Sequence, residues 1–235
     1  MTILTGDTHG DFRRVEDFCR KHETSKDDLL IILGDAGINY YKGKKDMLLK
    51  HALLELPITI LCLHGNHERR PETLGTYNEI EWHGGLVYIE QDFPDLLFAK
   101  DGEVYTIDGK KCIVIGGAYS VDKEYRLERN WGWWADEQPS DEIKVRVENR
   151  LSIEKWHVDV VLTHTAPIKY EPREVFLSFI DDSKVDKSTE IWLDMIEDKL
   201  DYDQWYCGHY HTDKHIDKLR FLYKDFVELK GGTHV

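Results

Sequence analysis

The stretch GDTHGD (residues 6–11) follows a short apolar run, TIL (2–4), and stands where a first buried strand would end. Asp7 and His9 can bind one divalent metal ion together, because side chains that leave the end of a strand can converge on it. The flanking glycines let the backbone turn sharply and keep Cβ atoms out of the way. The hexapeptide therefore predicts part of a metal site, and the remaining ligands must come from other segments.

Four further segments repeat this pattern of an apolar run that ends in polar residues. They are LLIILGD (29–35), ITILCLHGNHE (58–68), VDVVLTHTAP (158–167) and WYCGHYHTD (205–213). A single histidine or Gly-Asp pair after a strand is commonly a surface residue or a turn. Five such strand ends in one chain indicate a shared site, because ligands collect outside the carboxyl ends of parallel strands in an open α/β sheet. We expect these residues to meet: Asp7, His9, Asp35, Asn66, His67, His164, His209 and His211.

The order of the predicted elements indicates an α/β fold with mixed sheets. Apolar residues at helical spacing predict helices over 12–22 and 47–54 between the first three strands, as in βαβ units. Asp108-Gly109 predicts a hairpin within 103–117, and Asp217-Lys218 predicts another near the carboxyl end. We expect an irregular aromatic loop over 118–142, then a helix capped by Ser140. With no repeat or linker, residues 1–235 are predicted to form one domain.

Composition limits the classes of function. Lys and Arg number 31 against 45 Asp and Glu among 235 residues, which gives a formal net charge of −14. So acidic a surface repels phosphate backbones, and this argues against a nucleic-acid partner or a nuclease. No apolar run is long enough for a membrane span, and no basic segment precedes an apolar stretch. The four cysteines form no C-x-x-C pair, so we expect reduced thiols and a cytoplasmic protein.

The chemistry of the candidate ligands points to two metal ions. Asp, Asn and His ligands without cysteine suit manganese, iron or zinc. Seven candidate ligands, the residues above without His67, are too many for one tetrahedral ion. They suit two ions about 3.5–4 Å apart that share a bridging carboxylate. We expect two divalent ions as cofactors, with manganese as the first choice and iron, zinc or nickel as alternatives.

The ordered set GDTHG, GD, GNHE, a distal His and GHYH resembles the calcineurin-like metallophosphoesterase superfamily over residues 6–213. The resemblance implies a β-sandwich of mixed sheets flanked by helices (αββα), with a dinuclear centre at the strand carboxyl ends. It implies that Asp35 bridges two ions and that His67 lies beside the scissile phosphate as a catalytic residue. The implied ligands of the first ion are Asp7, His9, Asp35 and His211. Those of the second are Asp35, Asn66, His164 and His209.

The second motif departs from one branch of the superfamily. Phosphoprotein phosphatases extend it as Gly-Asp-x-x-Asp-Arg-Gly, whereas this chain has GDAGINY (34–40) and lacks that aspartate and arginine. This argues against a serine/threonine protein phosphatase, although GDTHGD resembles that branch and the activity stays an alternative. Arg69 and Arg70 are candidates for the missing phosphate contact, and a solvent-facing pair is the other interpretation. Arg126 and Asn66 are further candidates for substrate binding.

These patterns predict a metal-dependent phosphoester hydrolase for a small phosphomonoester or phosphodiester, nucleotide-like esters included. Two cations would activate water for attack, and His67 would protonate the leaving group. A non-catalytic scaffold of the same fold is the alternative, but scaffolds tend to lose ligands and here every expected position is filled. The tryptophans of segment 118–139 could stack a base, or they could serve only as a hydrophobic plug or an oligomer contact. A homo-oligomer is compatible with the sequence.

Overall fold

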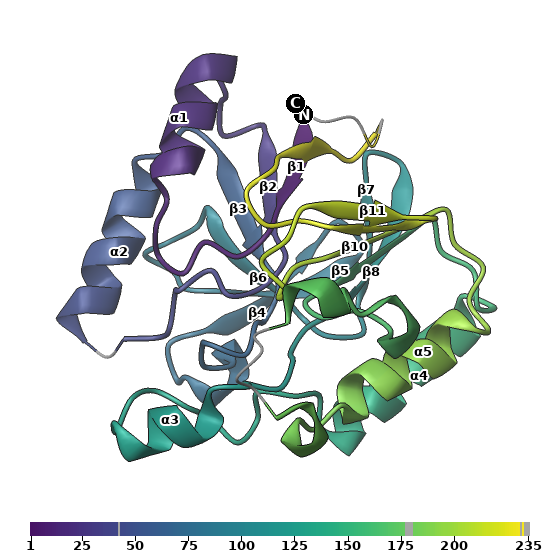
Figure 1. The fold of residues 1–235 in the computed structure, drawn as a ribbon. Coiled ribbons are helices and arrows are strands. Elements are labelled where there is room, and N and C mark those ends of the chain that lie inside the picture. Colours follow the sequence, from purple (N-terminus) through teal and green to yellow (C-terminus); the bar gives the residue numbers. More distant parts are fainter. Residues whose placement is uncertain (42, 177–180, 231, 233–235) are drawn as a thin grey trace.

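The computed structural model describes residues 1–41, 43–176, 181–230 and 232, and Figure 1 shows their arrangement. Two β-sheets pack face to face, and helices cover the outer face of each sheet. The predicted α/β class with two mixed sheets flanked by helices is confirmed. No helix among the described residues is long and apolar enough to cross a membrane.

The first sheet has the strand order β13-β1-β2-β3-β6-β5-β4. Four neighbouring strands run parallel: β1 (Thr2–Thr5), β2 (Leu29–Ile32), β3 (Thr59–Cys62) and β6 (Leu96–Ala99). The others pair antiparallel at the two edges: β13 (Val227–Glu228), β5 (Gly85–Ile89) and β4 (Asn78–Trp82). Because β1, β2 and β3 are parallel neighbours, their carboxyl ends lie side by side.

The second sheet has the order β11-β12-β10-β9-β8-β7. Its parallel strands are β12 (Leu219–Phe221), β10 (Gln204–Cys207), β9 (Val160–Thr163) and β8 (Lys110–Ile115). Its antiparallel edges are β11 (Lys214–Ile216) and β7 (Val104–Ile107). The predicted hairpins through Asp108-Gly109 and Asp217-Lys218 are therefore present as β7–β8 and β11–β12.

The outer layers are helical. Helices α1 (Arg13–His22) and α2 (Lys44–Leu54) cover the first sheet, while α4 (Asp141–Ile153) and α5 (Ser188–Glu197) cover the second (Figure 1). The short α3 (Lys123–Glu128) stands apart from both layers. Single-turn 3₁₀ helices occur at Pro71–Thr73, Ile168–Tyr170, Arg173–Val175 and Asp182–Lys184.

Alternation along the central strands explains the layering. Ile3 and Leu30 pack under α1 and α2, whereas the next residues, Leu4 and Ile31, pack between the two sheets. Successive side chains of a strand point to opposite faces, so a strand covered on both faces is apolar throughout. Each fully buried side chain of this kind stabilises the fold by about 1.5–3 kcal/mol. This double burial fixes the strand ends, and with them the loops that follow.

Four elements differ from the sequence-based expectations. Segment 118–142 is not wholly irregular, because α3 forms within it from DKEYRLE, whose residues are mostly good helix formers. The sequence patterns also do not predict strands β4, β6 and β13. The β4 sequence NEIEW is mostly polar and lies at a sheet edge, where burial leaves little apolar signal.

Candidate metal centre

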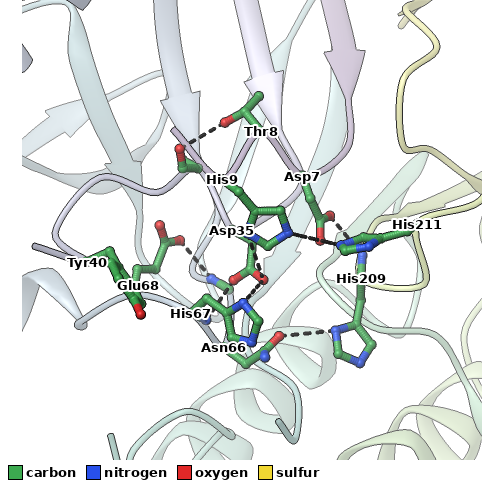
Figure 2. A network of polar contacts seen from close by, with 12 residues as sticks. Asp7, Thr8, His9, Asp35, Tyr40, Asn66, His67, Glu68, His209 and His211 are labelled. Atoms are coloured by element: carbon green, nitrogen blue, oxygen red, sulfur yellow. Dashed lines mark hydrogen bonds and ion pairs between the residues drawn. The ribbon is translucent and has the colours of Figure 1, made fainter. Parts of the chain in front are cut away.

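The loops after five parallel strands meet at one place where the two sheets come together. Figure 2 shows Asp7, Asp35, Asn66 and His209 at this place. The loops after β1, β2 and β3 come from the first sheet, and those after β9 and β10 come from the second. The structure brings together all seven side chains that the sequence singles out as metal ligands. They are Asp7, His9, Asp35, Asn66, His164, His209 and His211.

Asp7, His9 and His211 form the first group. Asp7 Oδ2 lies 3.2 Å from His211 Nε2 and 3.7 Å from His9 Nε2, and the two imidazole nitrogens are 3.0 Å apart. The other carboxylate oxygen, Asp7 Oδ1, accepts a hydrogen bond from the backbone N–H of His209 at 2.9 Å. This bond fixes the carboxylate with Oδ2 toward the two rings. The ligand atoms of this group lie within 4.8 Å of one another, close enough to hold one ion.

Asn66, His164 and His209 form the second group. Asn66 Oδ1 lies 2.9 Å from His164 Nε2 and 3.1 Å from His209 Nδ1. Asn66 Nδ2 donates to Ser120 Oγ at 2.9 Å, which directs the amide oxygen toward the rings. His164 Nδ1 faces the carbonyl oxygen of Leu33 at 2.7 Å, so a neutral ring carries its proton on Nδ1 and keeps the lone pair on Nε2. With that neutral ring, two acceptor atoms face each other without a proton between them, and a cation placed between them would satisfy both.

Asp35 lies between the two groups. Its Oδ2 is 3.9 Å from His9 Nδ1, and its Oδ1 is 3.7 Å from His164 Nε2. The backbone N–H of His67 donates to Oδ1 at 2.8 Å and holds the carboxylate in place. Each oxygen therefore faces a different group, which is the arrangement that a bridging carboxylate needs.

The backbone around these ligands is held in unusual conformations. His9, Asp35, His209 and His211 have φ angles of 48°, 49°, 66° and 50°, in the left-handed region that non-glycine residues seldom adopt. Such strain persists where the surrounding structure imposes it, and it clusters at functional sites. A Cβ at Gly65 would overlap Asp35, and a Cβ at Gly34 would overlap the His164 ring. The glycines of the GD and GNHE motifs are therefore needed for the close approach of neighbouring loops.

Electrostatics favour the metal-binding forms of Asp7, Asp35 and His209, whereas the Asp7 carboxylate raises the pKa of His211. Burial opposes the charge of the Asp7 carboxylate, but the surrounding histidines, with His211 first, outweigh it and lower its pKa. The pKa of Asp35 is likewise lowered by His164 and His67 against the effect of burial. Burial, together with His164, lowers the pKa of His209 to about 3. Anionic carboxylates and neutral imidazoles are the forms that bind cations.

His67 lies at the edge of this cluster, with its Nδ1 3.4 Å from Asp35 Oδ2. Burial disfavours its charged form, yet Asp35 and Asp122 outweigh burial and raise its pKa. His67 also makes a group of ligand-like atoms with His9 and Asp35, so proximity alone does not exclude it as a ligand. However, the Arg126 guanidinium lies 3.2 Å from its Nδ1, and a fixed positive charge disfavours a metal ion at this nitrogen.

The three arginines discussed from the sequence have different environments. Arg126 is buried beside His67 and also donates to Tyr40 and to the carbonyl of Gly132. Arg69 donates to the carbonyl oxygens of Asn39 and Tyr41, so it braces the loop after β2. Arg70 is buried and donates to Asp101 at 2.6 Å, so the solvent-facing interpretation is wrong for Arg70.

Sequence reasoning missed Ser120 and Asp122, which touch the site through Asn66 and His67. Both belong to segment 118–139, which follows β8. The Gly116-Gly117 pair at the end of β8 does predict that this loop turns toward the site, because glycine pairs mark sharp turns, but it does not single out these two residues.

The profile of the calcineurin-like phosphoesterase family matches residues 2–213, which include every ligand named above. The chain belongs to this family. No curated protein matches the chain. The family comprises metal-dependent phosphoesterases, so the His and Asp groups at the strand ends are its candidate metal-binding groups.

A solved structure supports the fold of this calcineurin-like phosphoesterase. The protein TT1561 of Thermus thermophilus aligns over 100% of this chain and 96% of its own, with a TM-score of 0.55 and 12% identity. A phosphopantetheinyl hydrolase from Mycobacterium tuberculosis aligns over 94% of this chain and 87% of its own, with a TM-score of 0.49 and 16% identity. At such low identity, the likeness to the Thermus protein concerns the fold alone.

Proposed function

We propose that this protein is a two-metal phosphoester hydrolase that acts on a small phosphomonoester or phosphodiester. One observation carries the proposal. Asn66 Oδ1 and His164 Nε2 lie 2.9 Å apart, and with a neutral imidazole both are hydrogen-bond acceptors, because Ser120 and Leu33 engage their donor atoms. Buried acceptors that face each other are costly without a cation. This pair therefore supports a metal site, and the neighbouring Asp35 supports a shared one.

The donor set suits two divalent ions of intermediate hardness. The first ion would be held by Asp7, His9, Asp35 and His211, and the second by Asp35, Asn66, His164 and His209. Nitrogen and oxygen ligands without thiolate favour manganese, with iron, zinc or nickel as alternatives. Because these ligands come from both sheets, we also propose that residues 1–235 act as one domain.

His67 is the proposed catalytic residue. When bound, the two ions would polarise phosphoryl oxygens and activate water for attack on phosphorus. The bond between phosphorus and the leaving oxygen then breaks, and that oxygen needs a proton. His67 Nδ1 faces the cluster and would deliver it, and the ring would regain a proton from solvent. The buried Arg126 guanidinium beside Nδ1 would offer positive charge to the phosphate.

The surroundings of His67 favour a small ester over a polymer. Tyr40 accepts a hydrogen bond from Arg126 and packs against Trp134 with ring centroids 5.7 Å apart. Aromatic rings beside a phosphate site can stack a flat group such as a nucleobase, so nucleotide-like esters belong in the substrate class. The net charge of −14 disfavours a nucleic-acid polymer as substrate.

A phosphoester panel tests this proposal. Protein stripped of metal is assayed on alkyl and aryl monoesters and diesters, with manganese, iron, zinc or nickel restored singly. We expect hydrolysis only with a restored ion, and its loss in Asp35→Asn. Asp11→Asn is the matched control, because Asp11 is an exposed carboxylate of the same hexapeptide that pairs with Arg13. Absence of hydrolysis with every ion and ester would favour a non-catalytic scaffold.

A further inference from the structure

Both ring nitrogens of His67 have charged neighbours. Nδ1 lies 3.4 Å from Asp35 Oδ2 and 3.2 Å from Arg126 Nη2, on the side of the metal ligands. Nε2, on the opposite side of the ring, lies 3.5 Å from Asp122 Oδ1. The same oxygen of Asp122 accepts a hydrogen bond from Arg126 Nε at 2.8 Å. His67, Asp122 and Arg126 therefore form a closed triangle of polar contacts.

We propose that Asp122 is a positioning residue for this site. Its carboxylate anchors Nε2 of His67, so that Nδ1 faces the reacting oxygen. The inference rests on the proposed phosphoesterase function and names a residue outside the family motifs. Asp122 does not reach the metal ligands itself, and it acts through the imidazole.

The hydrogen-bond inventory of the triangle supports this role. An arginine side chain has only donors, so Arg126 Nη2 can approach Nδ1 as a hydrogen bond only when that nitrogen is an acceptor. This is the neutral ring that remains after Nδ1 has given up its proton, and its other proton lies on Nε2, the nitrogen that faces Asp122. The 3.5 Å separation is long for a hydrogen bond, as such contacts often are before the substrate binds.

The chain supplies this triangle from an unexpected place. The second motif, GDAGINY, has neither an aspartate nor an arginine after Asp35. Asp122 directly precedes α3, and Arg126 lies within it. This four-residue spacing puts both side chains on one face of the helix. Segment 118–139 thus brings a carboxylate and a guanidinium together to the imidazole of GNHE.

A purely structural role for Asp122 would be to cap α3. Asp122 does stand at the first position before this helix, but its side chain makes no capping hydrogen bond. Its carboxylate instead faces His67 and Arg126. With about one third of the Asp122 side chain exposed, the residue is not part of a packed core, and its replacement should leave the fold intact.

Kinetics on an alkyl phosphate ester test the proposal. Asp122→Ala should lower kcat by about 10-fold to 100-fold. This decrease is smaller than the decrease of about 10²–10⁴-fold that is expected when a general acid is removed completely. Asp122→Asn keeps an acceptor oxygen and should lose less. Glu128→Gln, an exposed acidic residue on the same helix, is the matched control and should match wild type. Equal losses in Asp122→Ala and Glu128→Gln would overturn the proposal.

A double-mutant cycle asks whether Asp122 acts through His67. In a His67→Ala background, Asp122→Ala should cause no further loss of kcat, because the group that it positions is gone. An equal loss in both backgrounds would mean that Asp122 acts independently of His67 and would contradict the proposal.

A measurement without turnover completes the test. In proton–nitrogen NMR spectra of the metal-free protein, His67 should show an Nε2-bound proton protected from exchange, present in Asp122→Asn and lost in Asp122→Ala. The same signal in Asp122→Ala would refute the anchoring contact. A wild-type protein that shows the signal but hydrolyses no ester would instead refute the phosphoesterase function.

Discussion

Asp7 Oδ2 lies 3.2 Å from His211 Nε2, although Asp7 follows β1 of one sheet and His211 follows β10 of the other. This contact joins the two halves of the sandwich at their carboxyl edge. The first group of candidate ligands exists only when both sheets have packed, so metal binding there would depend on the tertiary structure. Metal removal is therefore expected to lower the melting temperature as well as the activity.

Asp35→Asn is expected to be the most damaging single change at the site, since Asp35 faces both groups of ligands. The affinity for both ions should decrease. Activity should fall by more than the factor of about 10–100 that is typical when a residue behind a metal ligand is lost. Metal analysis of dialysed protein measures the stoichiometry. Retention of two ions and of activity by this variant would exclude Asp35 as the bridge.

His67→Ala should leave two ions bound while kcat falls by about 10²–10⁴-fold on alkyl phosphates. The loss should shrink for an activated aryl phosphate, because its departing oxygen needs little protonation. The ratio of kcat values on the two substrates, wild type against variant, measures the difference. An equal loss on both substrates would argue against the leaving-group role.

Trp134→Ala should raise KM for nucleotide-like esters and spare small aryl phosphates, because Trp134 packs on Tyr40, which contacts Arg126. A stacked base would account for about 1–3 kcal/mol of the difference. Trp131→Ala is the control, since Trp131 is exposed and packs on Tyr125. Unchanged KM ratios with a lower melting temperature would show that Trp134 serves packing alone.

Glu190 predicts a dependence of stability on pH. Burial raises its pKa to about 7, although Thr165 donates a hydrogen bond to it. Because the folded-state pKa lies above the unfolded value, the free energy of unfolding should fall as pH rises toward and through about 7. Relative to wild type, Glu190→Gln should gain about 2–3 kcal/mol between pH 5 and pH 8, measured by urea unfolding. Parallel pH profiles of the two proteins would contradict this.

The sequence predicts the convergence of the candidate ligands, because each one lies in the loop that follows a buried strand. The apolar run fixes the strand, the parallel order fixes the edge, and the polar residue after it has little freedom. This pattern does not predict Ser120 and Asp122, because they lie in a loop and reach Asn66 and His67 through tertiary contacts alone.

Hydrophobic pattern also misplaces the buried face of α2. The helical spacing of apolar residues predicts Met47 and Leu48 on the buried face, yet both are exposed, while Lys50 is buried. Lys50 forms ion pairs with Asp46 at 2.9 Å and Glu90 at 2.7 Å. A charge can be buried when it is paired, and a pattern of apolar residues carries no sign of the pairing.

Anomalous diffraction from crystals grown with manganese tests the central claim most directly. If the centre is dinuclear, we expect two manganese peaks about 3.5–4 Å apart, one on each side of Asp35. One peak should contact Asp7, His9 and His211, and the other should contact Asn66, His164 and His209. A single peak, or two peaks that share no carboxylate, would contradict the dinuclear centre.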